Sequence, residues 1–238
     1  ILPCARTAMK FIILATLLLT LCLRAAGAQP KSAEEIMLDV RQSYAGQNQE
    51  LQGELRDDAT GRTESLELTM GNQVMSFLFS TPPVETIRLD LKTSPARLFQ
   101  VSKGTSRQVP ASQLGSKVRG MDLNYEDLSL GFLYWPRPQL MGQDRVSGQK
   151  CWIVRVINPG REGPYYAVDI WVHQASGGAA KMTAYDRSSK IIKRYEVTKM
   201  QKVNGANALK ELRVETLDPA TGKVQGRTYM KMNTPAKP

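Results

Sequence analysis

The sequence predicts an α+β fold: one strongly curved antiparallel sheet of about ten or eleven strands, or a half-open antiparallel β-barrel, with helices covering the concave face. Three observations lead to this prediction. Alternating apolar and polar residues fill most of the chain, the turns between these segments are too short for parallel crossovers, and only two stretches repeat at helical spacing. A chain of 238 residues is long enough to bury one extended core.

Residues 1–28 are interpreted as a secretory signal peptide. A basic start at Met9-Lys10 precedes an apolar run from Phe11 to Leu23, and the small residues Ala26-Gly27-Ala28 place the cleavage site after Ala28. Residues 1–8 are interpreted as lying upstream of the true start at Met9. Because the apolar run is too short for an ordinary transmembrane helix, residues 29–238 are expected to be one exported, soluble domain without a membrane anchor.

The first helix is predicted over residues 30–44. Ser32 followed by Glu35 has the spacing of a capping box, and Gly46 is placed to end the helix. An amphipathic helix at this point is expected to pack on the sheet. Its apolar stripe consists of Ile36, Met37, Val40 and Tyr44.

Ten strands are predicted in hairpin order, because short segments of period two are separated by turns rich in Gly, Pro, Asn and Asp. Residues 103–119, which are polar and contain Pro110, are interpreted instead as an irregular loop and a plausible lid hinge. The predicted strands cover residues 66–70, 74–79, 85–91, 97–101, 149–157, 165–173, 181–186, 191–198, 208–216 and 226–232.

The second helix is predicted over residues 122–130, with Asp122 as its N-cap and the acids Glu126 and Asp127 near its start. Gly131 and Pro136 end it, and an aromatic cluster follows directly. This stretch either covers a hydrophobic pocket or simply closes the core of the sheet. The pattern alone allows both interpretations.

Catalytic and metal-binding chemistry finds little support. Beyond residue 28 the chain has one cysteine, Cys151, and one histidine, His173, so a zinc site cannot be assembled from such ligands. Both residues lie on strands, where no helix N-terminus activates a thiol. The acid pairs Glu126-Asp127 and Asp57-Asp58 are explained by a helix start and a turn. No cofactor is expected, and the protein is predicted not to be an enzyme.

The chain has a net charge of +10, from 32 Lys and Arg against 22 Asp and Glu. Nucleic-acid binding requires such charge to gather on one element with aromatic residues between the basic ones. Here the basic residues are scattered along alternating strands. No nucleic-acid partner is therefore expected.

The late strands have one apolar and one charged face, which is typical of a sheet with one covered side. The chain also contains ten methionines, whose flexible side chains suit an adaptable apolar lining. Such a surface suits an acyl chain, but it equally suits an ordinary core.

Several short motifs stand out along the chain: Gly120 to Leu128, Trp135-Pro136, Cys151-Trp152, Asn158-Pro159, Ile170-Trp171-Val172 and Ile192 to Val197. These motifs resemble the outer-membrane lipoprotein-sorting protein family, the LolA-like periplasmic carriers, and in particular its uncharacterised branch. The resemblance extends over the chain beyond the signal peptide and is clearest from Gly120 onward. It implies a half-open antiparallel barrel whose helical lid closes a cavity for the acyl chains of lipoproteins.

The resemblance also implies an arginine near the mouth that tethers the lid, for which Arg41, Arg56 and Arg119 are all candidates. The first hypothesis is a monomeric periplasmic carrier of lipoproteins or other lipids, with helices at 32–44 and 122–130 as the lid and a membrane-bound transporter or receptor as possible partner. Its cavity is predicted to be lined by Tyr125, Leu128, Phe132, Trp135, Trp152, Val154 and Tyr166.

Two other classes remain open. The same scaffold can serve as a periplasmic sensor or interaction module that binds a membrane-anchored protein partner. A hydrolase of unknown type is the third alternative.

Overall fold

A computed structural model describes residues 31–160, 162–203 and 205–235. The predicted signal peptide and its cleavage site at Ala28 lie outside the described residues. Within the described ranges, no helix is both long enough and apolar enough to span a membrane.

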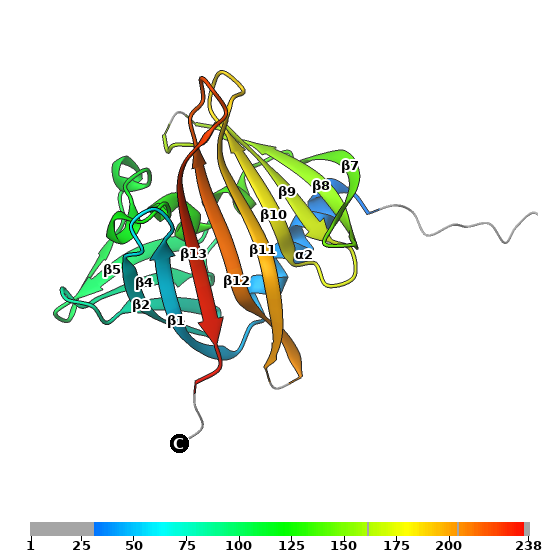
Figure 1. The fold of residues 1–238 in the computed structure, drawn as a ribbon. Coiled ribbons are helices and arrows are strands. Elements are labelled where there is room, and N and C mark those ends of the chain that lie inside the picture. The colour runs from blue at the N-terminus through cyan, green and yellow to red at the C-terminus, as the bar shows by residue number, and fades with distance from the viewer. Residues whose placement is uncertain (1–30, 161, 204, 236–238) are drawn as a thin grey trace, which may run out of the picture. The chain divides into compact units, whose positions relative to one another are not determined.

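A single antiparallel sheet of thirteen strands forms the body of the protein, in the order β6-β5-β4-β3-β2-β1-β13-β12-β11-β10-β9-β8-β7. Figure 1 shows the sheet strongly bent, and its two edge strands, β6 and β7, do not pair with each other. The strands are β1 (Gln49–Asp57), β2 (Thr63–Gly71), β3 (Val74–Phe79), β4 (Glu85–Asp90), β5 (Arg97–Ser102), β6 (Thr105–Gln108), β7 (Gln139–Val146), β8 (Gln149–Ile157), β9 (Ala167–His173), β10 (Ala179–Tyr185), β11 (Ile191–Val203), β12 (Ala206–Leu217) and β13 (Val224–Asn233).

The curved, open, antiparallel sheet is confirmed, but the predicted count of ten or eleven strands is wrong. Each of the ten predicted segments overlaps an observed strand, and β1, β6 and β7 are additional. Strands β6 and β7 were not predicted because they lie at the sheet edges. Every residue of β6 is exposed and only Val146 of β7 is buried, so neither has an alternating apolar face.

The helices are short. Helix α2 (Ala33–Ala45) has the predicted capping box between Ser32 and Glu35, with the Ser32 Oγ accepting from the Glu35 backbone at 3.2 Å. Helix α3 covers only Tyr125–Ser129. The described residues also contain three 3₁₀ turns: η1 (Ala111–Gln113), η2 (Val118–Gly120) and η3 (Gly131–Tyr134). The segment interpreted as a loop, 103–119, therefore holds β6, η1 and part of η2.

One buried core joins these helices to the sheet. Ile36 and Val40 of α2 and Leu128 of α3 belong to the same cluster as Leu51 and Phe79 of the sheet. Helix α2 contacts β8 and η3, and α3 contacts β5. Burial of these apolar side chains is the main stabilising contribution.

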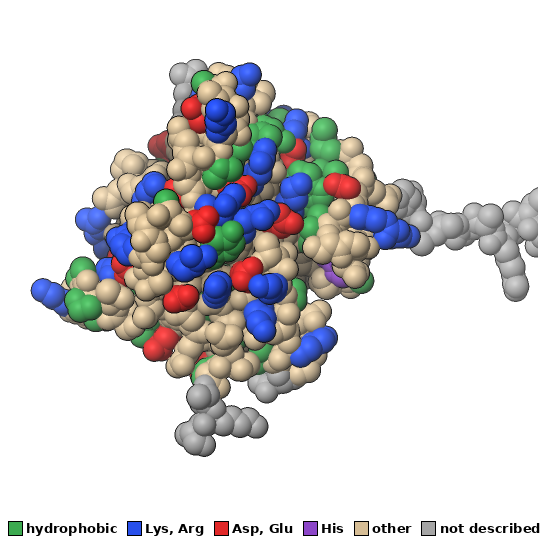
Figure 2. Space-filling view, viewed as in Figure 1, with side chains coloured by type: hydrophobic (Ala, Val, Ile, Leu, Met, Phe, Trp, Pro, Cys, Tyr) green, Lys and Arg blue, Asp and Glu red, His purple; other side chains and the backbone are tan. Residues whose placement is uncertain are grey.

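The opposite face of the sheet is charged. Arg227 of β13 lies 2.8 Å from Glu215 of β12, and Arg213 of β12 lies 2.6 Å from Glu196 of β11. Figure 2 shows basic and acidic side chains interspersed over this face. The excess positive charge is thus not gathered on one element.

Candidate ligand-binding cavity

A cavity of about 260 Å³ lies between the bent sheet and the helical segments. Its inner wall is apolar and includes Leu68 of β2, Phe77 of β3, Leu123 before α3 and Leu212 of β12. Its size is slightly below the roughly 300–1,000 Å³ typical of small-molecule sites. Its soft lining also contains five methionines, which are Met70, Met75, Met182, Met200 and Met230.

Polar residues gather at the open end of this cavity. Ser176 and Asn207 line it and are exposed, and Met200 beside them is 53% exposed. Gln47 and Gln49, where the chain passes from α2 into β1, line the same end. The cavity therefore has a mainly apolar interior and a polar mouth.

Two of the seven residues predicted to line a lipid cavity are part of its wall, namely Leu128 of α3 and Phe132 of η3. Trp135 packs edge-on against Phe132, with 6.4 Å between ring centroids, but does not itself line the cavity. The turn from α3 into η3 thus brings the apolar side chains of Leu128 and Phe132 to the cavity.

The other four predicted residues lie outside the wall. Tyr125 is buried, and its hydroxyl accepts a hydrogen bond of 2.7 Å from the Gln100 amide. Val154 is buried in the sheet core, and Trp152 packs half-buried against that core. Tyr166 is half-buried near Arg187, whose guanidinium lies 5.9 Å from the ring centre. Whether any of the seven contacts an acyl chain stays a prediction.

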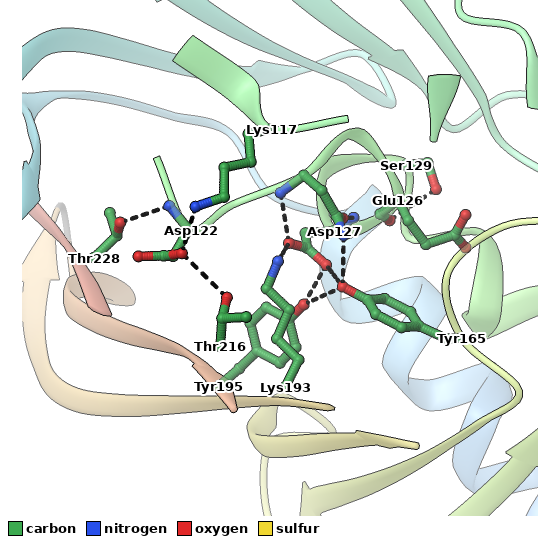
Figure 3. A network of polar contacts seen from close by, with 11 residues as sticks. Lys117, Asp122, Glu126, Asp127, Ser129, Tyr165, Lys193, Tyr195, Thr216 and Thr228 are labelled. Carbon is green, nitrogen blue, oxygen red and sulfur yellow. Dashed lines mark hydrogen bonds and ion pairs between the residues drawn. The ribbon is translucent and has the colours of Figure 1, made fainter. Parts of the chain in front are cut away.

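Sequence reasoning missed a buried polar network at the inner end of the cavity, drawn in Figure 3. The Asp127 carboxylate accepts hydrogen bonds from Lys193 Nζ at 2.8 Å, from the Asn124 backbone at 2.7 Å and from the hydroxyls of Tyr165 and Tyr195. Asp127 and Tyr195 also line the cavity. Burial is the main cause, and the charge of Asp127 the second, of a pKa well above the ordinary value for both Tyr165 and Tyr195.

This network fixes α3 to the sheet. Asp127 belongs to α3, whereas Lys193 and Tyr195 belong to β11, and the side chains of the Asp127–Lys193 pair are 2% and 7% exposed. A buried pair of this kind persists only where further hydrogen bonds satisfy it, as the two phenols do here. The negative charge of Asp127 is thereby neutralised.

The predicted cap at Asp122 is wrong, because Asn124 caps α3 through its side chain. Asp122 is instead buried, with Oδ1 accepting from Lys117 Nζ at 2.9 Å and from Thr216 Oγ1 at 3.2 Å. A Cβ at Gly226 would overlap this carboxylate, so the glycine leaves room for it. Asp122 thus ties the segment before α3 to β12 through Thr216, and its backbone N–H donates to Thr228 Oγ1 of β13 at 2.9 Å.

Comparison with known proteins places this architecture in a family. A family model described as an uncharacterized protein matches residues 97–236. A putative outer membrane lipoprotein-sorting protein domain from Vibrio parahaemolyticus has the same fold, with a TM-score of 0.65 and 14% identity over 84% of this chain and 90% of that chain. The chain belongs to the family that this model describes, and its fold is LolA-like.

Two further solved structures support the LolA-like fold. A LolA superfamily protein from Nitrosomonas europaea has a TM-score of 0.60 and 16% identity, over 88% of this chain and 96% of that chain. A DUF1329 family protein from Desulfovibrio piger has a TM-score of 0.58 and 16% identity, over 84% and 90%. No curated protein matches the chain.

The three arginines considered as lid tethers in this LolA-like chain have different partners. Arg41 of α2 donates to the Leu133 carbonyl of η3 at 3.2 Å and stacks 5.4 Å from the Tyr134 ring centre. Arg119 pairs with Glu64 at 2.9 Å and so holds η2 to β2. Arg56 lies beside Asp58 on the outer face. Of the three, Arg41 is the one that joins α2 to η3 at the cavity.

Cys151 and His173 do not form a nucleophile pair in the LolA-like structure. Cys151 and His173 are opposite one another on β8 and β9, but Cys151 is fully buried, and burial raises the pKa of its thiol. The His173 ring contacts Ser176 at 2.8 Å and Gln149 at 3.3 Å instead. A thiol with a raised pKa has little reactive thiolate. In the described part of the chain, no group of acids, cysteines and histidines suits a metal ion.

Glu126 makes the stability of this protein depend on pH. It is 4% exposed, and burial, then the charge of Asp127, raises its pKa from 4.5 to about 7. Because folding favours the protonated form, the stability that this group contributes is complete below about pH 4.5 and is lost as pH rises through about 7. We expect Glu126→Gln to remove a pH-dependent loss of up to about 3 kcal/mol.

Urea unfolding of both proteins at about pH 5 and about pH 8.5 measures this difference. Between these values the wild type is expected to lose more unfolding free energy than the variant. Equal losses in the two proteins would show that Glu126 titrates in the folded state as it does in water.

Proposed function

We propose that this LolA-like protein is a periplasmic carrier that shelters acyl chains of lipoproteins or other lipids in the cavity. The observation that supports the proposal best is the apolar interior. Asp127 is the one acidic group among the described residues that line it, and Lys193 already neutralises it. Each acyl methylene that leaves water there contributes roughly 0.8 kcal/mol. Such a site needs area and adaptability rather than directed bonds, and the methionines supply both. The proposal includes no catalytic step.

In this proposal α2 is the moving part of the lid and α3 is a fixed wedge. The buried Asp127–Lys193 pair holds α3 to β11, and breaking it costs several kcal/mol. Helix α2 is amphipathic, and the charged Arg41 gives it a half-buried hydrogen bond to a carbonyl of η3 that contributes about 1.5–3 kcal/mol, less than the cost of breaking the buried ion pair. Movement of α2 would open the cavity for loading from, or delivery to, a membrane-bound transporter or receptor.

Native mass spectrometry of the protein taken from its own periplasm, followed by organic extraction, tests the proposal. A bound acylated species that is lost on denaturation supports it and names the cargo. An empty protein that also fails to take up a fluorescent acyl probe overturns it. That result would favour the interaction module that binds a membrane-anchored protein.

A charge inside the cavity should weaken acyl binding. Leu209 of β12 is half-buried in the wall, so Leu209→Glu would place a carboxylate against the acyl chain and lower affinity for a fluorescent acyl probe by at least about tenfold. Leu140→Glu is the matched control, because Leu140 is 41% exposed on β7 and outside the wall. Unchanged probe binding in the folded Leu209→Glu protein would exclude this cavity as the site.

A further inference from the structure

A buried acceptor without a donor lies at the mouth of the cavity. Gln49 is 6% exposed, and its Oε1 has no hydrogen-bond partner among the described residues. Buried polar atoms in folded proteins are nearly always paired, so an orphan one indicates a missing ligand or water. Gln49 belongs to the inward face of β1 together with Leu51, and it lines the cavity.

The surroundings fix which way the Gln49 amide points. Its Nε2 donates to the Asn207 backbone carbonyl at 3.3 Å and to Gln47 Oε1 at 2.8 Å. Gln47 is oriented in turn, because its Nε2 donates to the Ser43 carbonyl at 2.8 Å. Both ends of this chain of bonds are backbone carbonyls, which only accept. A flipped Gln49 amide would face oxygen with oxygen, so Oε1 must be the atom left free.

The charges of the wall decide what kind of donor fits. Of the described residues that line the cavity, only Asp127 is an acid and only Lys181 is a base, and both side chains have other partners. Asp127 is bound by Lys193, and Lys181 Nζ lies 4.3 Å from the centre of the Trp171 ring. A carboxylate head next to Gln49 Oε1 would meet another acceptor without a counter-charge from the wall.

We propose that the cavity takes an amphiphile with an acyl tail inside and an uncharged, hydrogen-bond-donating head, an amide N–H or a hydroxyl, bound by Gln49 Oε1 at the mouth. This inference rests on the proposed carrier function and specifies its ligand. The polar mouth formed by Ser176, Asn207 and Gln47 accommodates such a head, and the methionine-rich interior accommodates the tail. Free fatty acids are disfavoured because their head is an anion without a hydrogen to donate.

Four probes with the same sixteen-carbon acyl chain test the assignment on the delipidated full chain. Palmitamide offers an amide donor, monopalmitoylglycerol offers hydroxyl donors, methyl palmitate offers acceptors only, and palmitate offers an anion. Each probe competes with a fluorescent acyl probe at a pH where palmitate is ionised. We expect at least one of the two donors to bind roughly tenfold more tightly than methyl palmitate, and palmitate to gain nothing over the ester.

Gln49→Met keeps the length of the side chain and removes the acceptor, so the tenfold preference for donors should fall to about one. Gln174→Met is the matched control, because Gln174 lies outside the cavity wall and should keep the preference. If Gln49→Met does not fold, the ratio of donor to ester affinity in the wild type decides by itself.

The outcomes are separable. A preference for palmitamide alone or for monopalmitoylglycerol alone supports the inference and distinguishes an amide head from a hydroxyl head. Equal binding of all four probes means that Oε1 binds water only, and tightest binding of palmitate means an anion site. Either result overturns the inference while the carrier function stands. If no probe binds and the fluorescent probe is not taken up, the carrier function itself fails.

Discussion

Lys193→Met is expected to lower the free energy of unfolding by about 3–5 kcal/mol, because it leaves the Asp127 carboxylate buried without its counter-ion. The two side chains are 2.8 Å apart and nearly inaccessible to water. The hydroxyls of Tyr165 and Tyr195 and the backbone of Asn124 still bind the carboxylate in the variant. These donors place the loss toward the lower end of that range. Chemical denaturation measures it.

The double variant Lys193→Met with Asp127→Leu separates the ion pair from its desolvation. Removal of both charges should recover part of the loss, since a buried pair replaced by apolar residues is often close to neutral in stability. Lys199→Met is the surface control, because its side chain is 61% exposed although it pairs with Glu211 at 3.2 Å. That change should cost about 0–1 kcal/mol. A loss below about 1 kcal/mol in Lys193→Met would mean that the pair is not buried in solution.

Local signals made α2 and most strands predictable. Ser32 and Glu35 cap α2 because the free backbone N–H groups at a helix start need acceptors. The two side chains that supply them are three residues apart, and this spacing is visible in a sequence. Strand β3 was predicted at its observed bounds, 74–79, because turn residues flank it on both sides. An element can therefore be predicted from the sequence where its periodicity and its end signals both lie in neighbouring residues.

Edge strands lack that local signal. Strand β6 is exposed along its whole length, and its backbone pairs with β5 on one side only. No side chain of β6 faces the core, so its sequence shows no apolar alternation. Polar edge strands also discourage pairing with other molecules, so their composition resembles that of a loop. The same reasoning applies to β7, which pairs only with β8.

The candidate site was predictable only in part. Leu128 and Phe132 were identified because helical spacing puts them on one apolar face. Asp127 was interpreted as helix-start charge, and it does bind the α3 cap, but its ion-pair partner Lys193 is 66 residues away. A lysine at an inward-facing strand position was the available signal. Gln49 gave no signal at all, because only the surrounding carbonyls show that its oxygen is unpaired.

Strand β1 was not predicted because of Gly53, and the same residue predicts the second large effect of a substitution on stability. Gly53 interrupts the alternation of β1, and it does so where β1 pairs with Met232 of β13 and Leu66 of β2. A Cβ at this position would overlap the Lys231 carbonyl oxygen and lie 2.8 Å from the carbonyl carbon. The glycine therefore permits a close approach of two backbones. The same glycine removes an apolar side chain from the alternating pattern by which β1 would have been recognised in the sequence.

Gly53→Ala is consequently expected to destabilise the protein by about 3 kcal/mol or more, the upper end of the cost of overpacking. The obstructing atoms are backbone, so no side-chain rotation relieves them, and β1 and β13 must separate. The pairing of β1 with β13 joins strands β1 to β6 to strands β7 to β13. Separation of β1 from β13 would therefore disturb the cavity wall in both parts of the sheet. Gly115→Ala is the matched control: its Cβ would meet Pro164 at 3.8 Å, an ordinary contact. Chemical denaturation should show a change within about 0.5 kcal/mol for Gly115→Ala and a large loss for Gly53→Ala. Equal stabilities of the two variants would mean that β1 and β13 do not approach closely at Gly53, and that the sheet is joined there in another register.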